Sequence, residues 1–179
     1  MKKNIRSLCE TGILIAASVI LEFLFKMIPF MDMPSGGSVS ITMLPILLIG
    51  YRNGTKYGLI GGVTYGLIDF AIGGYAFHLG SIFFDYIFAY GFLGLSGLFR
   101  EKIDKLWVYI LGLFIPCFIR YLCHSLSGFI FFKANDVSNA YGLFYSFILY
   151  NGPYMLISTI LCIILSIPLR NLVIGNKNK

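Results

Sequence analysis

The chain has 179 residues, of which 58% are hydrophobic and only 12% are charged, and its formal net charge is +6. Soluble domains carry about 25% charged residues, so this composition excludes an ordinary water-soluble domain and indicates a protein dissolved in lipid. The basic residues lie singly or in small groups between apolar runs, which argues against nucleic-acid binding in spite of the positive charge.

Six apolar segments follow one another, and together they predict an all-α integral membrane protein with six transmembrane helices. The first segment is too long for a signal peptide, so we expect it to be retained as a helix. The second, with about 13 residues, reaches only about 20 Å, so it must be extended by its flanking loop or lie beside a thinned or protein-lined region. We expect a single membrane domain over residues 1–179, with helices at about 8–28, 39–51, 56–72, 80–99, 106–132 and 143–169.

The distribution of Lys and Arg predicts the orientation of these helices. Positively charged loops stay in the cytoplasm, and with six spans the two termini and the second and fourth loops share one side. Only Lys26 and Lys133 lie at the opposite side, and Arg120 lies within a segment. The sequence therefore predicts both termini in the cytoplasm, together with the basic residues Lys2, Lys3, Arg6, Arg52, Lys56, Arg100, Lys102, Lys105, Arg170, Lys177 and Lys179.

Small residues recur at helical spacing in several segments. In lipid, helices associate where small residues allow their backbones to approach closely, so these stripes predict packing within the chain. A further pair, Gly12 and Ala16, lies near the cytoplasmic side of the first segment, where contact with a partner subunit is an alternative to internal packing. The stripes are Gly58, Gly62 and Gly66 in the third segment and Gly91, Gly94 and Gly97 in the fourth.

Polar and ionisable side chains from separate segments converge at one depth, near the outer ends of the helices. Such groups are costly inside a membrane, so each is a candidate functional residue. Arg120 and His124 are four residues apart and share one helix face. A carboxylate, a guanidinium, an imidazole, an amide and phenols at one depth predict a binding pocket. The candidates are Tyr75, Asp85, Arg120, His124, Gly128, Tyr145 and Asn151.

These residues also have structural interpretations. Asp85 and Arg120 can form a buried ion pair, His124 can be a hydrogen-bonded core histidine, and the tyrosines can belong to an interfacial belt. Asn151, which precedes Gly-Pro, can satisfy backbone groups freed at a kink. Tyr145 lies about 240° from Asn151 around a regular helix, so both face one ligand only where the helix is irregular. The tyrosines concerned are Tyr86, Tyr121, Tyr150 and Tyr154.

The sequence contains no catalytic signature for hydrolysis, metal binding or nucleotide binding. Its two histidines are too few for a metal site, and without a P-loop the energy for uphill transport must come from a partner. We therefore expect no catalytic residues, no cofactor and no metal. An intramembrane enzyme that uses Asp85, Arg120 and His124 stays open as an alternative.

Five stretches, in order along nearly the whole chain, resemble one known family. They are GGSVSITMLPI at 36–46, YRNG at 51–54, DY at 85–86 with GFLG at 91–94, RYLCHSLSG at 120–128, and the stretch 145–152. Together they resemble the thiamine-specific S components (the ThiT family) of energy-coupling factor (ECF) transporters. The resemblance implies a subunit of the bacterial plasma membrane that captures thiamine at the extracellular face for ATP-driven uptake.

The resemblance also implies roles for individual residues and partners. Gly12 and Ala16 would dock an ECF module, which consists of a transmembrane coupling protein and two cytoplasmic ATPases. Some relatives stack the ligand on tryptophan, but Trp107 lies at the cytoplasmic end, so another vitamin or a thiamine precursor is an alternative ligand. The implied substrate-binding residues are the acidic Asp85 with its neighbour Tyr86, the basic Arg120, His124, Gly128, the polar Tyr145 and Asn151, Tyr75 in a gating loop, and Phe132 at the stacking position.

Overall fold

A computed structural model describes residues 2–29, 31–34, 36–134 and 136–177 of the chain. Within these ranges the secondary structure is helical, apart from loops and one isolated antiparallel bridge between Asp32 and Ser38. The predicted all-α class is therefore confirmed for the described part of the chain. Lys179, one of the C-terminal charges counted above, lies outside the described residues.

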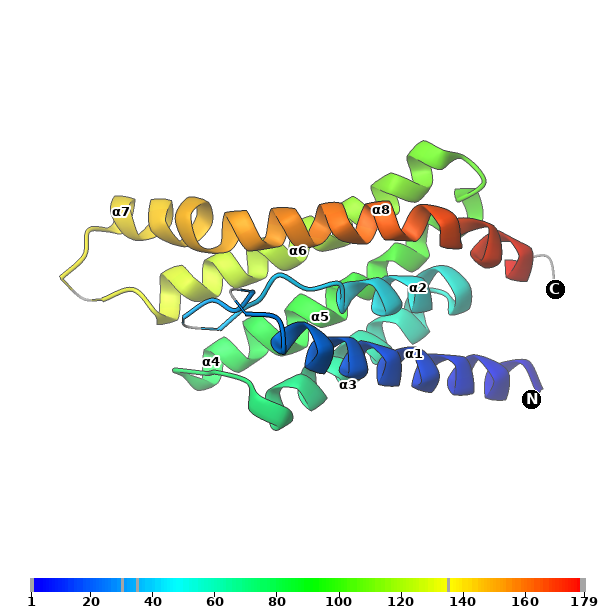
Figure 1. Ribbon diagram of the computed structural model, residues 1–179, viewed down its shortest axis with the longest axis horizontal. Helices are drawn as coiled ribbons and strands as arrows, with labels where there is room; N and C mark the ends of the chain where they lie inside the picture. Colours follow the sequence, from blue (N-terminus) through cyan, green and yellow to red (C-terminus); the bar gives the residue numbers. More distant parts are fainter. Residues whose placement is uncertain (1, 30, 35, 135, 178–179) are drawn as a thin grey trace.

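The helical elements are arranged side by side along the long axis of the molecule, and the start of α1 lies at the same end as the end of α8 (Figure 1). The elements are α1 (Lys2–Lys26), α2 (Met43–Asn53), α3 (Thr55–Gly73), α4 (Leu79–Ile82), the π-helical η1 (Phe83–Phe88), α5 (Ala89–Gly91), the 3-10 helix η2 (Phe92–Lys102), α6 (Leu106–Phe131), α7 (Asn139–Phe144), the π-helical η3 (Tyr145–Asn151) and α8 (Gly152–Lys177).

Four stretches of the described chain are long and apolar enough to cross a membrane. Large apolar side chains on their outer faces, such as Ile13, Phe118 and Ile164, are exposed, as expected where lipid is the solvent. A topology of six spans with both termini in the cytoplasm stays a prediction. The four stretches are Asn4–Lys26, Leu79–Lys102, Leu106–Phe131 and Asn139–Asn171.

The short helix α2 runs through the centre of the bundle. Each of its residues from Met43 to Tyr51 is buried, so protein rather than lipid surrounds it, which is one of the two explanations expected for its length. The helix begins at Met43 rather than at residue 39, because the backbone amides of residues 39 and 40 donate hydrogen bonds to groups outside the helix. The Val39 amide donates to the Met31 carbonyl oxygen, and the Ser40 amide donates to Ser158 Oγ.

The last helical stretch begins earlier and ends later than the expected range 143–169. It starts at Asn139, where Ser138 caps α7 by accepting a hydrogen bond from the Tyr141 amide at 3.3 Å. It continues to Lys177, past Pro168 within α8. The loop after α6 is therefore short, and it lies at the end of the molecule away from the chain termini (Figure 1).

The glycine stripes pack against each other within the chain, as expected. The 3-10 helix η2 has three residues per turn, so glycines spaced by three lie on one face, and that face meets the glycines spaced by four on α3. An added Cβ on Gly58 would lie 2.7 Å from the Gly94 Cα, and one on Gly62 would overlap the Tyr90 carbonyl oxygen. This close approach brings the backbone of α3 directly against the backbone of α5.

Gly12 and Ala16 differ from these stripes because both are exposed on the outer face of α1. A Cβ added to Gly12 would meet no atom within 4 Å. Gly12 therefore makes no close contact with another helix of the described chain.

Candidate ligand-binding site

A large cavity of about 690 Å³ opens between the helices in the half of the bundle away from the chain termini. Its volume is in the range of small-molecule sites. All nine residues predicted to bind substrate line it. They are Tyr75 from the loop before α4, Asp85 and Tyr86 from η1, Arg120, His124 and Gly128 from α6, Phe132 just after α6, and Tyr145 and Asn151 from the two ends of η3.

The polar centre of the cavity is a chain of hydrogen bonds around His124. Its Nδ1 lies 2.8 Å from Asp85 Oδ1, and its Nε2 accepts from Arg120 Nε at 3.1 Å. Ser127 donates to Asp85 Oδ2 at 2.5 Å. His124 therefore lies between the carboxylate and the guanidinium, and the direct Asp85–Arg120 ion pair considered from the sequence is not the arrangement found.

The second polar group is built on the π-helical segment η3. Asn151 donates through Nδ2 to the Ser146 carbonyl oxygen at 2.9 Å, and its Oδ1 accepts from Tyr154 at 2.7 Å. The side chain thus pairs with backbone of the irregular turn, as its structural interpretation requires, and it also lines the cavity. Tyr145 lines the same cavity, so the irregularity that the sequence required for both to do so is present.

Asp85 also lies in a π-helical segment, η1, which is flanked by regular helix. Single π-helical turns inside α-helices occur frequently at functional sites, because the widened turn reorients side chains. Gly128 of α6 faces η3, where an added Cβ would overlap Ser146 Oγ. The glycine therefore lets the two elements close around the cavity.

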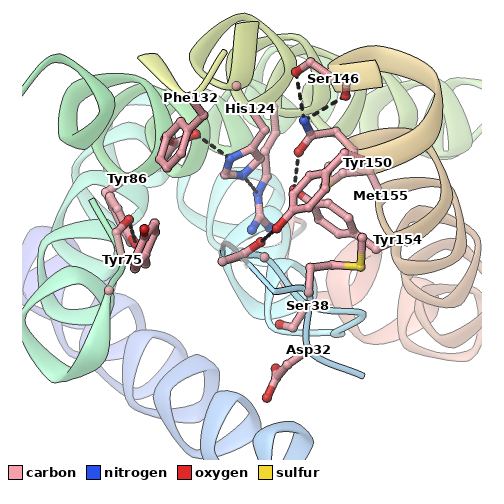
Figure 2. Close-up of a pocket in the computed structure, with 18 of the residues that line it drawn as sticks. Asp32, Ser38, Tyr75, Tyr86, His124, Phe132, Ser146, Tyr150, Tyr154 and Met155 are labelled. Atoms are coloured by element: carbon pink, nitrogen blue, oxygen red, sulfur yellow. Dashed lines mark hydrogen bonds and ion pairs between the residues drawn. The ribbon is translucent and has the colours of Figure 1, made fainter. Parts of the chain in front are cut away.

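Aromatic rings form two walls of the cavity, with His124 between them (Figure 2). On one side, Tyr86 donates to the Tyr75 carbonyl oxygen at 3.0 Å, and the rings of Tyr75 and Phe132 are 6.0 Å apart. On the other side lie Tyr150 and Tyr154. Two aromatic walls on either side of a polar centre suit a flat aromatic ligand.

The loop after α1 closes the cavity from a third side, since Asp32 and Ser38 of this loop line the cavity; both lie at the bottom of the view in Figure 2. Tyr150 donates to the Gly36 carbonyl oxygen at 2.9 Å, and this contact fixes the loop to η3. Gly36 and Gly37 have φ of 94° and 87°, a region that residues with a Cβ rarely adopt. The glycine pair is thus required by the tight fold of the loop.

The charged groups around the cavity leave a net negative charge. Four carboxylates face three basic side chains, and the hydrogen bonds of His124 fit a neutral ring, so the formal charge, with every carboxylate counted as ionised, is one negative unit. A cavity of this charge suits a monocation. The carboxylates are Glu22, Asp32, Asp69 and Asp85, and the basic groups are Lys26, Arg120 and Lys133.

Sequence reasoning missed several cavity residues. From the sequence, Tyr150 and Tyr154 could belong either to an interfacial belt or to the pocket, and both line the cavity. The Tyr121 hydroxyl instead donates to the Phe147 carbonyl oxygen. Tyr154 lies three residues after Asn151, and this helical spacing could have identified it. Glu22 and Tyr90 could be found only from the packing of α1 and α5 against α3.

Comparisons with known proteins agree on one family. The model of a family described as thiamine transporter protein (Thia_YuaJ) matches residues 8–174. The chain is 38% identical over 173 residues to the thiamine transporter ThiT of Bacillus subtilis (strain 168), covering 90% of this chain and 88% of that protein. Its fold matches a solved structure of ThiT from Listeria monocytogenes with a TM-score of 0.73 at 22% identity, covering 99% of this chain and 96% of that one.

Proposed function

We propose, because this chain belongs to the thiamine transporter protein family, that it captures thiamine at the extracellular face and passes it inward as the S component of an ECF transporter. The chain is a multi-pass membrane protein of this family, and the naming of its relatives as transporters points to a non-enzymatic role. The proposal adds the ligand, the side of capture and the source of energy.

The cavity supports thiamine as the ligand. Thiamine joins a permanently cationic, aromatic thiazolium to an aminopyrimidine that donates and accepts hydrogen bonds. An aromatic face attracts a desolvated cation by about 1–2 kcal/mol, and the single net negative charge of the cavity offsets the ligand charge. Asp85 and Asn151 offer the carboxylate and amide that can pair with the pyrimidine edge. This match of charge and aromatic walls is the observation that carries the proposal.

Capture at the extracellular face rests on the charge asymmetry of the loops. The cavity opens in the half of the bundle that carries Lys26 and Lys133, whereas the chain ends and the basic segment 100–105 lie at the opposite end. Basic loops remain cytoplasmic, so this arrangement supports a cavity that opens to the extracellular side. Reporter fusions test it, because a phosphatase joined within residues 132–138 should be active and one joined after α8 inactive.

Docking to an ECF module accounts for the energy of uptake, since the sequence has no nucleotide-binding motif. The exposed Gly12 and Ala16 on α1 provide a surface on which a partner helix can approach closely. In this proposal the coupling protein packs on α1 and two ATPases supply the energy.

Titration of the purified protein with thiamine tests the ligand. We expect saturable binding at or below micromolar concentration, with His78→Asn, outside the cavity, as a control that binds equally well. The separate pyrimidine and thiazole halves should bind more weakly than thiamine. Mass spectrometry of the co-purified ligand distinguishes thiamine from a precursor or another vitamin, and no binding at micromolar thiamine would contradict the proposal.

A further inference from the structure

The neutral form of His124 is fixed by its two neighbours. An arginine nitrogen can only donate a hydrogen bond, so the 3.1 Å contact from Arg120 Nε requires His124 Nε2 to be unprotonated. The one proton of the neutral ring must then lie on Nδ1, which donates to Asp85 Oδ1 at 2.8 Å. An imidazolium would place its Nε2–H against the N–H of Arg120.

Arg120 is itself held in place by groups outside the nine predicted site residues. It is 8% exposed, and its guanidinium lies over the ring of Tyr90, 4.1 Å from the centroid. The Tyr90 hydroxyl donates to Asp69 Oδ2 at 2.9 Å, and the ring of Tyr65 packs edge-on against Tyr90 at 4.7 Å. A continuous chain of contacts thus runs from α3 through α5 to His124 on α6.

We propose that Asp69, Tyr90 and Arg120 are positioning residues that hold His124 as a neutral imidazole with its proton on Nδ1. This inference rests on the proposed function. Both ring nitrogens are occupied by side chains of the protein, so the ring has no free nitrogen for a ligand and can meet one only through its face or its C–H edge. A neutral face can lie against a cationic aromatic ring, whereas an imidazolium at that position would repel it.

The other charged groups around the cavity leave this assignment unchanged, because the two contacts of His124 come from Asp85 and Arg120. The carboxylates of Glu22, Asp32 and Asp69 and the ammonium groups of Lys26 and Lys133 line the same cavity. Glu22 is paired with Lys26 at 3.2 Å, and Asp69 accepts a hydrogen bond from the Tyr90 hydroxyl. Both carboxylates therefore have partners other than the imidazole.

The test uses nitrogen NMR of the full-length protein with labelled histidine, first without thiamine. The chain has two histidines, and His78→Asn leaves His124 as the only source of signal. Asn can replace the cap that His78 provides to the Gly80 amide. We expect one protonated and one unprotonated ring nitrogen, with the proton on Nδ1. A proton on Nε2 alone, or on both nitrogens, would overturn the proposal whether or not thiamine binds.

Variants of the chain of contacts provide the second arm. Arg120→Met removes the donor to Nε2, so we expect changed ring signals and about tenfold or greater loss of thiamine affinity. Arg120→Lys restores an N–H donor and should restore the wild-type ring signals. Tyr90→Phe keeps the ring and loses only the bond to Asp69, so a loss of about threefold is expected.

Unchanged His124 signals together with wild-type affinity in Arg120→Met would overturn the positioning role and leave the proposed function intact. If Arg120→Met does not fold, Arg120→Lys and Tyr90→Phe provide the same comparison with less disturbance. Failure of the unmodified protein to bind thiamine would instead contradict the proposed function, since the ligand-free spectrum tests the histidine separately.

Discussion

At the scale of single residues, the site depends on a few side chains with two partners each. Asp85 accepts from His124 with one oxygen and from Ser127 with the other. Asn151 donates to Ser146 and accepts from Tyr154. Polar groups held by two partners are rigid, and a rigid site loses little entropy when a ligand binds to their remaining lone pairs.

We expect Asp85→Asn to weaken thiamine binding about tenfold or more, which is about 1.4 kcal/mol. The amide has one oxygen and one NH₂ group, so its oxygen can accept from only one of the two donors, His124 and Ser127. Its NH₂ group, itself a donor, would then face the other. It also removes the net negative charge of the cavity. Calorimetric titration measures the effect, and Asp136→Asn in an exposed loop is the matched control. Equal affinities in the two variants would place the ligand elsewhere.

We expect Asn151→Ala to lower the free energy of unfolding by about 1–3 kcal/mol, because it leaves the buried hydroxyl of Tyr154 and the Ser146 carbonyl oxygen without their partner. Thermal unfolding of the ligand-free protein measures the loss. The control is Asn139→Ala, at an exposed position at the start of α7. A variant as stable as the control would mean that the irregular turn does not need the amide.

At the scale of elements, α3 and the stretch from η1 to η2 pack backbone against backbone. We expect Gly62→Ala to destabilise the protein by about 1–3 kcal/mol, since the added methyl overlaps the Tyr90 carbonyl oxygen and must push α3 away from α5. Tyr90 would move with it, so ligand affinity should fall too. Gly12→Ala, which meets open space, is the control and should be neutral or slightly stabilising.

The sequence predicted the all-α class because long apolar runs separated by charged loops leave few alternatives. The spacing of Tyr145 and Asn151 required an irregular turn but did not predict that it is π-helical, and nothing in the sequence indicated the π-helical segment around Asp85, since one widened turn does not alter the hydropathy of a span. Nor could the sequence place His124 between Asp85 and Arg120. That order depends on the rotation of α6 and η1 about their own axes, which helices with apolar residues on all sides do not reveal.

At the scale of the whole molecule, the bundle presents a ligand cavity in one half and an exposed pair of small residues, Gly12 and Ala16, on α1. We expect Gly12→Leu with Ala16→Leu to abolish assembly with the coupling protein and thiamine uptake, because larger side chains keep a partner helix away. Thiamine binding by the isolated subunit should be unchanged. Co-purification and uptake assays measure the two effects.

The control for this substitution is Ala71→Leu, which adds the same bulk at an exposed position on α3. Assembly should survive it. If the double substitution on α1 leaves uptake intact, the partner docks on another face of the bundle.

The two π-helical segments have a consequence for how such a site can diverge between relatives. A widened turn holds one residue more than the same stretch of α-helix needs, so deletion of one residue within 145–151 returns the turn to regular geometry. The helix on either side of the deletion then keeps its face, and only the side chains within the turn change direction. Gain or loss of one codon in η1 or η3 can thus redirect the cavity side chains of that turn while the rest of the bundle is kept.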